Sequence, residues 1–99
     1  MIVVAGTIPI RPEAREEAVR AAVAVVAATK GEEGCIAYDF YADLADPCRF
    51  HVFEEWASPE ALAAHLQQPH TQAFLASLGR LAAGPPNVKR YVVERTEPL

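Results

Sequence analysis

The stretch CIAYDFYADLADPCRFHVFEEW, residues 35–56, decides the fold. It contains two runs rich in aromatic and β-branched residues, 35–41 and 49–56. Between them lies the segment 43–47, which holds two aspartates and a proline. Strand-like runs joined by a short turn-forming segment are typical of a β-hairpin. We therefore predict two adjacent antiparallel strands.

Alternate side chains of this hairpin point to opposite faces of the sheet. We predict a register with Cys35 opposite Glu55 and Cys48 opposite Ala42. The first face is apolar and aromatic apart from one carboxylate, and consists of Ile36, Tyr38, Phe40, Phe50, Val52, Glu54 and Trp56. The second face mixes charged and aromatic side chains, and consists of Cys35, Ala37, Asp39, Tyr41, Arg49, His51, Phe53 and Glu55. We expect helices to cover the first face and a second copy of the chain to cover the other.

The segments on either side complete the fold. Ile2–Ile10 is β-rich, and residues 12–30 carry apolar side chains at helical spacing. Ser58 suits the N-cap of a second helix, which Pro69 interrupts, and residues 88–95 form a last strand-like run. The order β-α-β-β-α-β predicts an α+β, ferredoxin-like fold with a four-stranded antiparallel sheet and its helices on one face.

Length and composition limit the function. We expect residues 1–99 to form a single domain, with 52% hydrophobic residues and a net charge of −4. This balance offers no basic surface for nucleic acid. Met1–Ile10 lacks a basic region and is too short to span a bilayer, so we expect no membrane association. Cys35 and Cys48 fit no metal or disulfide spacing and predict reduced thiols in a cytoplasmic protein.

Glu54 is the unusual residue of the apolar face. A buried carboxylate is costly unless it is paired or protonated. His65 lies on the apolar stripe of the second helix and would face the sheet, so Glu54 could orient it as a general base. Tyr38 and Trp56 would then flank a flat aromatic ligand. The alternative is that Glu54 and His65 only satisfy each other in the core.

The remaining histidines suggest structural roles. We expect His51 on the open face of the sheet and His70 as a cap or surface residue at a helix start. The histidine spacing matches no zinc signature. The chain also has no Gly-rich phosphate loop and no dinucleotide fingerprint. We therefore expect no metal and no cofactor.

Residues 33–38, 50–56 and 58–65, followed by Pro69-His70 and Phe74, resemble the antibiotic biosynthesis monooxygenase (ABM) domain family. The resemblance covers essentially the whole chain in order and spacing. It implies a homodimer in which two ferredoxin-like sheets pack into a barrel, with a pocket between sheet and helices in each subunit. Some members oxygenate quinols or aromatic polyketides without flavin or metal.

The resemblance implies a cofactor-independent monooxygenase that oxidises a quinol or polycyclic phenol with O2. His65 would be the base and Glu54 its orienting acid. The apolar walls of the substrate site would be Tyr38, Phe40, Trp56 and Phe74. Two alternatives remain open, namely a non-oxidative enzyme such as an isomerase of a small metabolite, and a stress-associated ligand-binding domain without turnover.

The chain departs from the haem-degrading relatives of this family. Those proteins use an Asn on the first strand, a Trp on the second helix and a His further along. Here the first strand has no Asn, His65 stands at roughly the place of the Trp, and Leu75 stands where the His would be. Haem degradation is therefore disfavoured.

Overall fold

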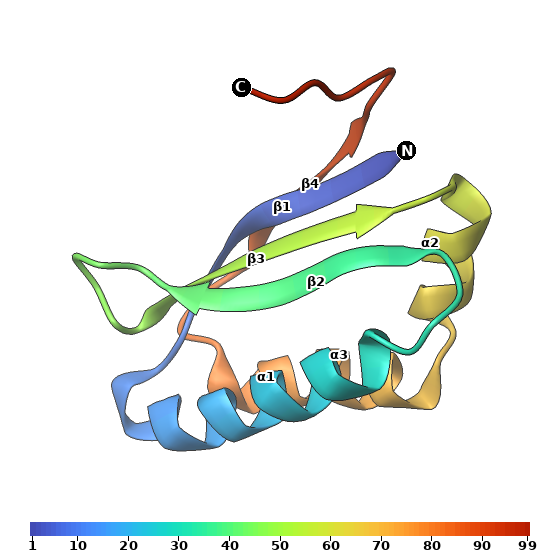
Figure 1. Cartoon of the computed structure of the whole chain (residues 1–99). Coiled ribbons are helices and arrows are strands. Elements are labelled where there is room, and N and C mark those ends of the chain that lie inside the picture. Colours follow the sequence, from blue (N-terminus) through green and yellow to red (C-terminus); the bar gives the residue numbers. More distant parts are fainter.

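The alternation of β-rich and helical segments produces a two-layer structure (Figure 1). The computed structural model describes all residues, 1–99, with these elements: β1 (Ile2–Pro9), the 3-10 turn η1 (Pro12–Ala14), α1 (Arg15–Thr29), β2 (Cys35–Ala42), β3 (Arg49–Trp56), α2 (Pro59–Leu66), α3 (Pro69–Leu81) and β4 (Asn87–Val92). The strands form one antiparallel sheet in the order β2-β3-β1-β4. The predicted α+β, ferredoxin-like fold is confirmed.

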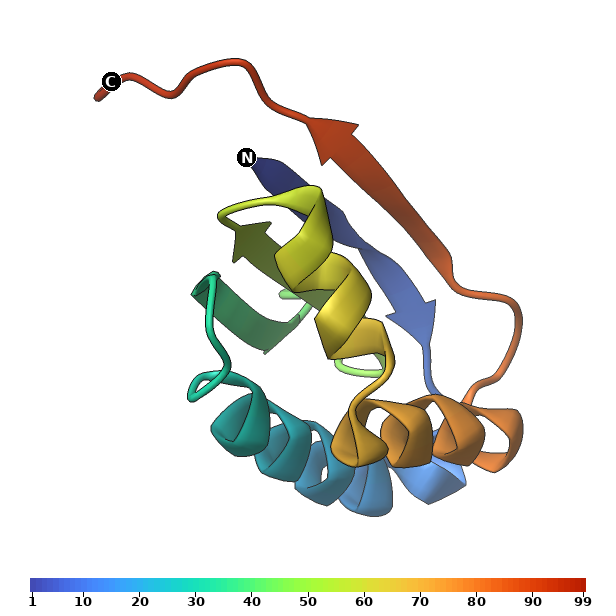
Figure 2. The same cartoon turned by 90° about the vertical axis from the view of Figure 1, so that its right-hand side faces the viewer.

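The boundaries predicted at Ser58 and Pro69 are confirmed, whereas the first helix, predicted from Pro12, begins as the 3-10 turn η1 and becomes α-helical only at Arg15. The Ser58 hydroxyl accepts a hydrogen bond from the Ala61 amide at 3.1 Å and caps α2. Pro69 then separates α2 from α3, because proline forces the preceding residue, Gln68, into an extended conformation with ψ 141°. Figure 2 shows α1 and α3 side by side under the sheet, with α2 crossing the sheet at a steep angle to them. α2 therefore closes one end of the space between sheet and helices.

The hairpin register differs from the prediction by two residues. Ala42 pairs with Phe50, whereas we predicted Cys48 as its partner. The turn is longer than expected because two aspartates hold it by side-chain bonds: Asp43 Oδ1 accepts from the Ala45 amide at 2.8 Å, and Asp46 Oδ1 accepts from the Cys48 amide at 2.9 Å. A shift of two residues preserves the faces, so the predicted assignment of β3 side chains is confirmed.

A β-bulge at the start of β2 overturns part of the predicted core. The pairing skips from Cys35 to Ala37, which leaves Ile36 without a partner and 58% exposed. Cys35 takes the inward position and packs against the core. Ile36 is thus wrongly predicted as a core residue, and Cys35 wrongly as an outward one. Both cysteines are free thiols, as predicted.

Two apolar clusters fill the space between sheet and helices. The cluster beside α2, called here the first cluster, contains Ile2, Val25, Tyr38, Trp56 and Leu62. The second cluster lies toward the other end and contains Ile8, Ile10, Ala18, Phe50 and Leu81. Phe40 packs against both. All four buried polar or charged side chains, Thr29, Glu54, His65 and Thr71, lie outside these apolar sets.

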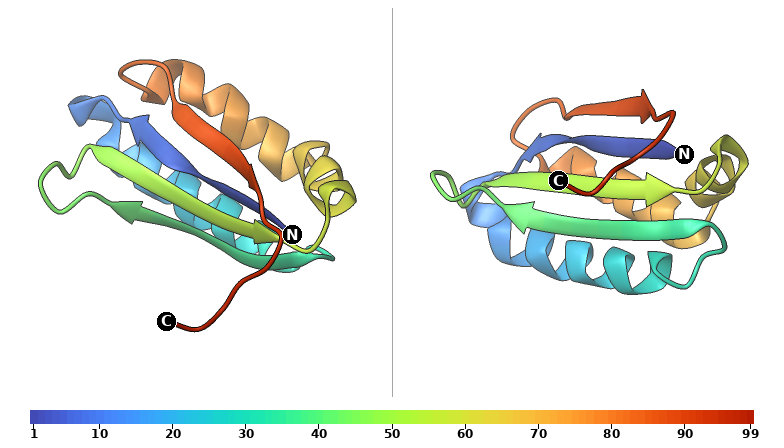
Figure 3. Two further views of the ribbon diagram at one scale, coloured as in Figure 1. Left: turned by 90° about the horizontal axis from the view of Figure 1, so that it is seen from above. Right: turned by 45° about the horizontal axis from the view of Figure 1, so that its top comes forward.

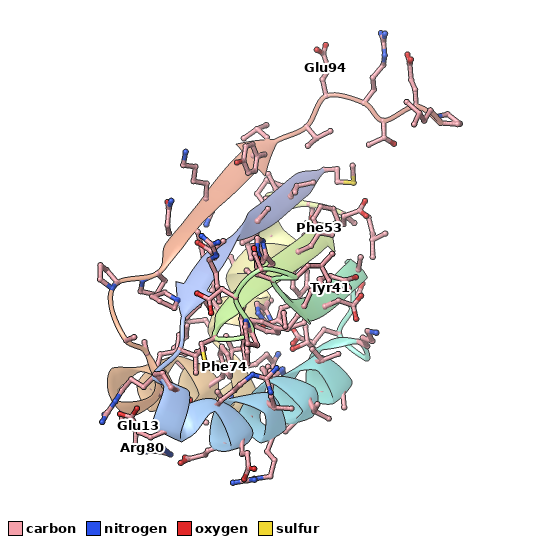
Figure 4. All side chains as sticks on the ribbon, turned by 90° about the vertical axis from the view of Figure 1, so that its left-hand side faces the viewer. Glu13, Tyr41, Phe53, Phe74, Arg80 and Glu94 are labelled. Atoms are coloured by element: carbon pink, nitrogen blue, oxygen red, sulfur yellow. The ribbon has the colours of Figure 1, made fainter.

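The other face of the sheet carries exposed aromatic side chains. Figure 4 shows Phe74 on the helix side of the sheet and Tyr41 and Phe53 on the opposite side. Tyr41 is 57% exposed and Phe53 39% exposed. Seen from above, the strands run side by side with the helices beneath them, and no helix covers this outer face (Figure 3). No helix of the chain has the length and apolar character needed to cross a membrane.

Gly6 on β1 allows β4 to pack closely. A Cβ atom at this position would lie 2.1 Å from the Asn87 carbonyl oxygen. A lone glycine in a strand predicts either a bulge or a close approach of backbone, and the structure shows the close approach with a regular register. β4 ends at Val92, three residues before the predicted end at Arg95, and the following residues extend away from the sheet (Figure 2).

Candidate active site

A cavity of about 380 Å³ lies between the sheet and the helix pair α2–α3. Its walls are mostly apolar and include Tyr38 and Phe40 from β2 and Phe74 from α3. Two ionisable side chains from opposite layers also line it, Glu54 from β3 and His65 from α2. β4 adds the exposed basic residues Lys89 and Arg90. An apolar cavity with a few polar groups has the usual character of a small-molecule site.

Glu54 is buried on the inner face of the sheet, as predicted. Its Oε1 accepts a hydrogen bond of 2.8 Å from the indole N–H of Trp56, two residues along the same strand. Burial raises the pKa of the Glu54 carboxyl above its ordinary value, while the Trp56 bond and nearby His65 oppose that rise. The carboxyl therefore lies in an environment that favours its protonated form.

His65 is held between two aromatic rings. Its ring centroid lies 4.6 Å from that of Trp56, with the planes 33° apart, and 5.2 Å from that of Tyr38. Burial raises the pKa of the Tyr38 phenol, so this group stays a neutral donor at physiological pH. The two rings fix the plane of the imidazole and leave it little rotational freedom.

The hydrogen-bond partner of His65 is Glu32, from the loop between α1 and β2. Glu32 Oε2 lies 2.9 Å from His65 Nδ1 and 2.6 Å from His70 Nε2. The Thr71 hydroxyl lies 3.2 Å from His65 Nδ1. The Glu32 side chain is 11% exposed and that of His65 3%. These four side chains, Glu32, His65, His70 and Thr71, are called here the Glu32 cluster.

Gly34 holds the loop that carries Glu32 against α2. Its φ of +83° is a conformation that glycine adopts readily, and a Cβ there would lie 2.5 Å from the Cβ of Ala61. The Gly34 carbonyl also accepts from the Ala57 amide at 2.8 Å. The loop therefore packs directly on the helix whose last turn carries His65, which fixes the distance between the carboxylate and the imidazole.

This arrangement determines which ring nitrogen of His65 carries the proton. An ionised carboxylate can only accept a hydrogen bond, so His65 Nδ1 donates to Glu32. In the neutral imidazole, Nε2 is then the unprotonated nitrogen. A histidine held in this tautomer by a carboxylate is suited to accept a proton from a bound molecule.

The structure brings most of the predicted site residues together. Tyr38, Phe40, Glu54, His65 and Phe74 all line the cavity. Glu54, however, makes no hydrogen bond to His65, so the predicted pairing is corrected: Glu32 orients the imidazole. The physical reason is that Glu54 is engaged by the Trp56 indole, while Glu32 approaches His65 from the loop.

Trp56 does not form a wall of the cavity. Its side chain is completely buried behind His65, where it packs on the imidazole and donates to Glu54. His70, expected as a cap or surface residue, lies in the Glu32 cluster with its side chain about three-quarters buried. His51 lies on the outer face of the sheet, as expected, with its Nε2 2.9 Å from Asp43 Oδ2.

Sequence reasoning missed Glu32. It precedes the strand by three residues in a loop that also holds Glu33, and loop side chains follow no period that would indicate their direction. The available signal was Gly34, since a glycine before a strand often marks a tight turn or close contact. This signal could have identified the loop as packed, but it could not have distinguished Glu32 from Glu33.

A second hollow, of about 580 Å³, lies between α1 and the edge strand β2. It is lined mainly by apolar side chains of α1, including Val19, Val23 and Val26. Its ionisable residues are all partly or fully exposed. It therefore lacks a buried acid or base, and the smaller cavity remains the candidate site.

The comparisons with known proteins show the family of the chain. A family model described as antibiotic biosynthesis monooxygenase matches residues 1–77, a span that includes the Glu32 cluster, Glu54 and Phe74. The uncharacterized protein sll1783 of Synechocystis is 35% identical over 98 residues, which cover 99% of this chain and 67% of that protein. YcnE of Bacillus subtilis, provisionally named a monooxygenase, is 32% identical over 90 residues, covering 91% of this chain and 95% of YcnE.

A solved structure shows the same fold. Rv0793 from Mycobacterium tuberculosis superposes with a TM-score of 0.89 and 27% identity, covering 96% of this chain and 96% of the other. The similarity therefore extends over β4, which lies beyond the residues matched by the family model.

Proposed function

Because the chain belongs to the antibiotic biosynthesis monooxygenase family, we propose that it is a cofactor-independent monooxygenase of a quinol or polycyclic phenol. The observation that carries the proposal is His65 at the wall of an apolar cavity, with Nδ1 bound to Glu32. Nε2 is then the base that removes the substrate's proton. Glu32 is a positioning residue, because it acts through His65.

The chemistry requires little more than a base and a dry pocket. Ground-state O2 reacts slowly with closed-shell molecules, but an electron-rich phenolate can give it one electron. His65 accepts the proton that the neutral substrate loses when it becomes this anion. For an activated CH2 group, the overall change is CH2 + O2 → C=O + H2O, so one oxygen atom enters the product and the other leaves as water. Burial of the cavity walls strengthens the electrostatic contacts made by the anion.

The cavity suits an aromatic substrate. Its volume of about 380 Å³ falls within the range of about 300–1,000 Å³ common for ligand pockets. Phe40 and Phe74 lie with ring centroids 5.3 Å apart and offer apolar faces at the wall. The neutral Tyr38 phenol can donate a hydrogen bond to a substrate oxygen, while burial raises the pKa of the Glu54 carboxyl on the same wall.

The test is oxygen uptake by metal-stripped, flavin-free protein with a panel of hydroquinones and anthrones. His65→Ala should lower kcat by about 10²–10⁴-fold, the usual contribution of a general base. Glu32→Gln should lower kcat with little change in KM, since the substrate does not touch Glu32. His51→Ala is the matched control, because His51 also contacts a carboxylate but lies away from the cavity. It should leave uptake unchanged.

The outcomes separate the three classes of function. If oxygen uptake is equal in His65→Ala and in the unmodified protein, the oxygenase activity is supported and the role of His65 as the base is rejected. Absence of uptake with the whole panel would argue against the oxygenase. Product formed under anaerobic conditions would then identify a non-oxidative enzyme, and ligand binding without product would identify a binding domain.

We also propose that the protein is a homodimer that pairs through the outer face of the sheet, and that it works in the cytoplasm. Exposed aromatic residues on that face, Tyr41, Phe53 and Tyr91, support the dimer. The two free thiols support a reducing compartment. Light scattering should give twice the monomer mass of 10.7 kDa at micromolar concentration. Phe53→Lys should shift that value toward the monomer.

A further inference from the structure

Three side chains that can bind a metal converge beside the cavity. Glu32 Oε2, His65 Nδ1 and His70 Nε2 all lie within 4.8 Å of one another. They come from three segments, namely the loop before β2, the last turn of α2 and the first turn of α3. The proposed reaction gives His70 no role, although its side chain is three-quarters buried against the carboxylate.

Both imidazoles point at the same carboxylate oxygen. His65 Nδ1 lies 2.9 Å from Glu32 Oε2 and His70 Nε2 lies 2.6 Å from it. When both N–H groups donate to this oxygen, their two hydrogens lie close together beside it. If each ring moves its proton to its other nitrogen, two lone pairs replace these hydrogens and face the same region as the carboxylate. One lone pair from each imidazole and one carboxylate oxygen can together bind a single metal ion.

The donor set selects the class of ion. Two imidazoles and one carboxylate suit divalent first-row transition metals such as Zn²⁺ and Co²⁺, whereas Mg²⁺ and Ca²⁺ prefer oxygen ligands alone. Zinc bonds to nitrogen and oxygen are about 2.0–2.2 Å long, so tetrahedral ligand atoms lie about 3.3–3.5 Å apart. The carboxylate oxygen would have to move away from each nitrogen by less than about 1 Å, and the two nitrogens, which lie within 4.8 Å of each other, would have to approach by up to about 1.5 Å.

The geometry points to a binding site for one divalent transition-metal ion at Glu32, His65 and His70, with water as the fourth ligand. The His70 side chain is 26% exposed, whereas that of His65 is 3% exposed, so the ion enters from solvent past His70. The site thus opens to the surface beside His70, while His65 also lines the cavity.

Metal binding would have a consequence for catalysis, and this part rests on the proposed function. A metal ion on Nδ1 obliges the neutral imidazole to carry its proton on Nε2. That nitrogen can then no longer accept a proton from a substrate. The tautomer shift moves one proton within the ring and releases none. Zn²⁺ is therefore an inhibitor of the proposed oxygenase, and the Glu32 cluster either orients the base or holds a metal.

Calorimetric titration of the metal-stripped protein with Zn²⁺ tests the site directly. We expect one ion per chain, a visible absorption spectrum of tetrahedral type with Co²⁺, and no heat with Mg²⁺. His70→Ala and Glu32→Gln should each weaken Zn²⁺ binding more than about 10-fold, the least effect expected when even an outer partner of a metal site is lost. Circular dichroism before each titration verifies folding. His70→Ala should disturb folding least, because His70 is the most exposed of the three ligands.

Two control variants exclude other sites. His51→Ala removes the other histidine–carboxylate pair, and the double variant Cys35→Ser/Cys48→Ser removes both thiols. Both should bind Zn²⁺ within about 2-fold of the unmodified protein. The site is rejected if Zn²⁺ produces no binding heat, if both ligand variants bind as well as the unmodified protein, or if a control variant loses binding.

Adding Zn²⁺ to the oxygen-uptake assay separates the two proposals. If calorimetry shows one ion at the cluster and uptake falls with the same saturation curve, both proposals are supported. If the ion binds and uptake continues, the metal site stands and His65 is not the base. If no compound of the panel supports uptake, calorimetry still decides the metal site, because it needs no substrate.

Discussion

The two ends of the space between sheet and helices differ in the polarity of their buried side chains. The second cluster, around Phe50 and Leu81, contains only apolar side chains. At the other end, around Tyr38 and Trp56, the apolar cluster is interrupted by four buried polar or charged residues: Thr29, Glu54, His65 and Thr71. Burying polar groups lowers stability unless each is fully paired. The second cluster therefore stabilises the fold, whereas the end around Tyr38 and Trp56 holds polar groups whose burial lowers stability where a partner is missing, as at Thr29.

The largest expected effect on stability belongs to the second cluster. Leu81 is 1% exposed, so Leu81→Ala leaves a cavity and should lower the free energy of unfolding by about 2–5 kcal/mol. Leu75→Ala, a half-exposed leucine of the same helix, is the matched control and should cost much less. Urea denaturation measures both. Equal losses in the two variants would contradict the assignment of Leu81 as a buried residue of the second cluster.

Substitution of Trp56 tests the end of the core that holds the buried polar residues. Trp56→Phe keeps most of the apolar packing but removes the N–H that donates to Glu54, so a buried acceptor loses its partner. The free energy of unfolding should fall by about 1–3 kcal/mol in urea denaturation followed by circular dichroism. The double variant Trp56→Phe/Glu54→Leu removes both partners and should recover part of this loss. A double variant less stable than Trp56→Phe would refute the explanation.

Two threonines should respond in opposite directions. The Thr29 hydroxyl is buried without a hydrogen-bond partner, so Thr29→Val should raise the free energy of unfolding by about 1 kcal/mol. The Thr71 hydroxyl contacts His65 Nδ1, so Thr71→Val should lower it by a similar amount. Thermal and urea denaturation provide the measurement. The same sign for both variants would contradict these hydrogen-bond assignments.

The smallest predicted effect is a pH dependence of stability at Glu54. Burial raises the pKa of this carboxyl in the folded state above its ordinary value of 4.5, with Glu32 adding to the rise and Trp56 and His65 opposing it. The folded state then holds the proton more tightly than the unfolded state, so the stability that it contributes is present below pH 4.5 and is lost as the pH rises.

Glu54→Gln removes this titration while keeping an acceptor for the Trp56 indole. The variant and the unmodified protein should have similar stability at pH 4, and the variant should become relatively more stable toward neutral pH. Urea denaturation across this range measures the difference. A difference that stays constant with pH would show that Glu54 titrates alike in both states.

Much of the fold could be predicted because its signals are local or periodic. The proline and serine at residues 58–59 mark a helix start, and the alternation in 50–56 assigns the faces of β3. The bulge at Ile36 could not be predicted, since one unpaired residue in a strand leaves the composition of the run unchanged. The predicted register was wrong by two residues because two aspartate side chains lengthen the turn.

The site was predicted only where it lies on regular elements. Glu54 and His65 follow from strand and helix periodicity, and both line the cavity. The carboxylate that binds His65 comes from a loop, whose packing depends on a contact between Gly34 and Ala61 that is distant in sequence. The indole bond to Glu54 depends on a rotamer of Trp56, which periodicity does not determine.

The strand order β2-β3-β1-β4 has a consequence for how the chain folds during synthesis. β1 is made first, yet its two neighbours, β3 and β4, are completed only when the chain has reached Trp56 and then Val92. At about 5–20 residues per second, the interval between these two residues lasts roughly 2–7 s. Throughout it, one edge of β1 lacks its partner strand. During this interval the chain lacks the strand that covers this edge of β1 in the complete sheet, and an unpaired strand edge is a template for pairing with other chains.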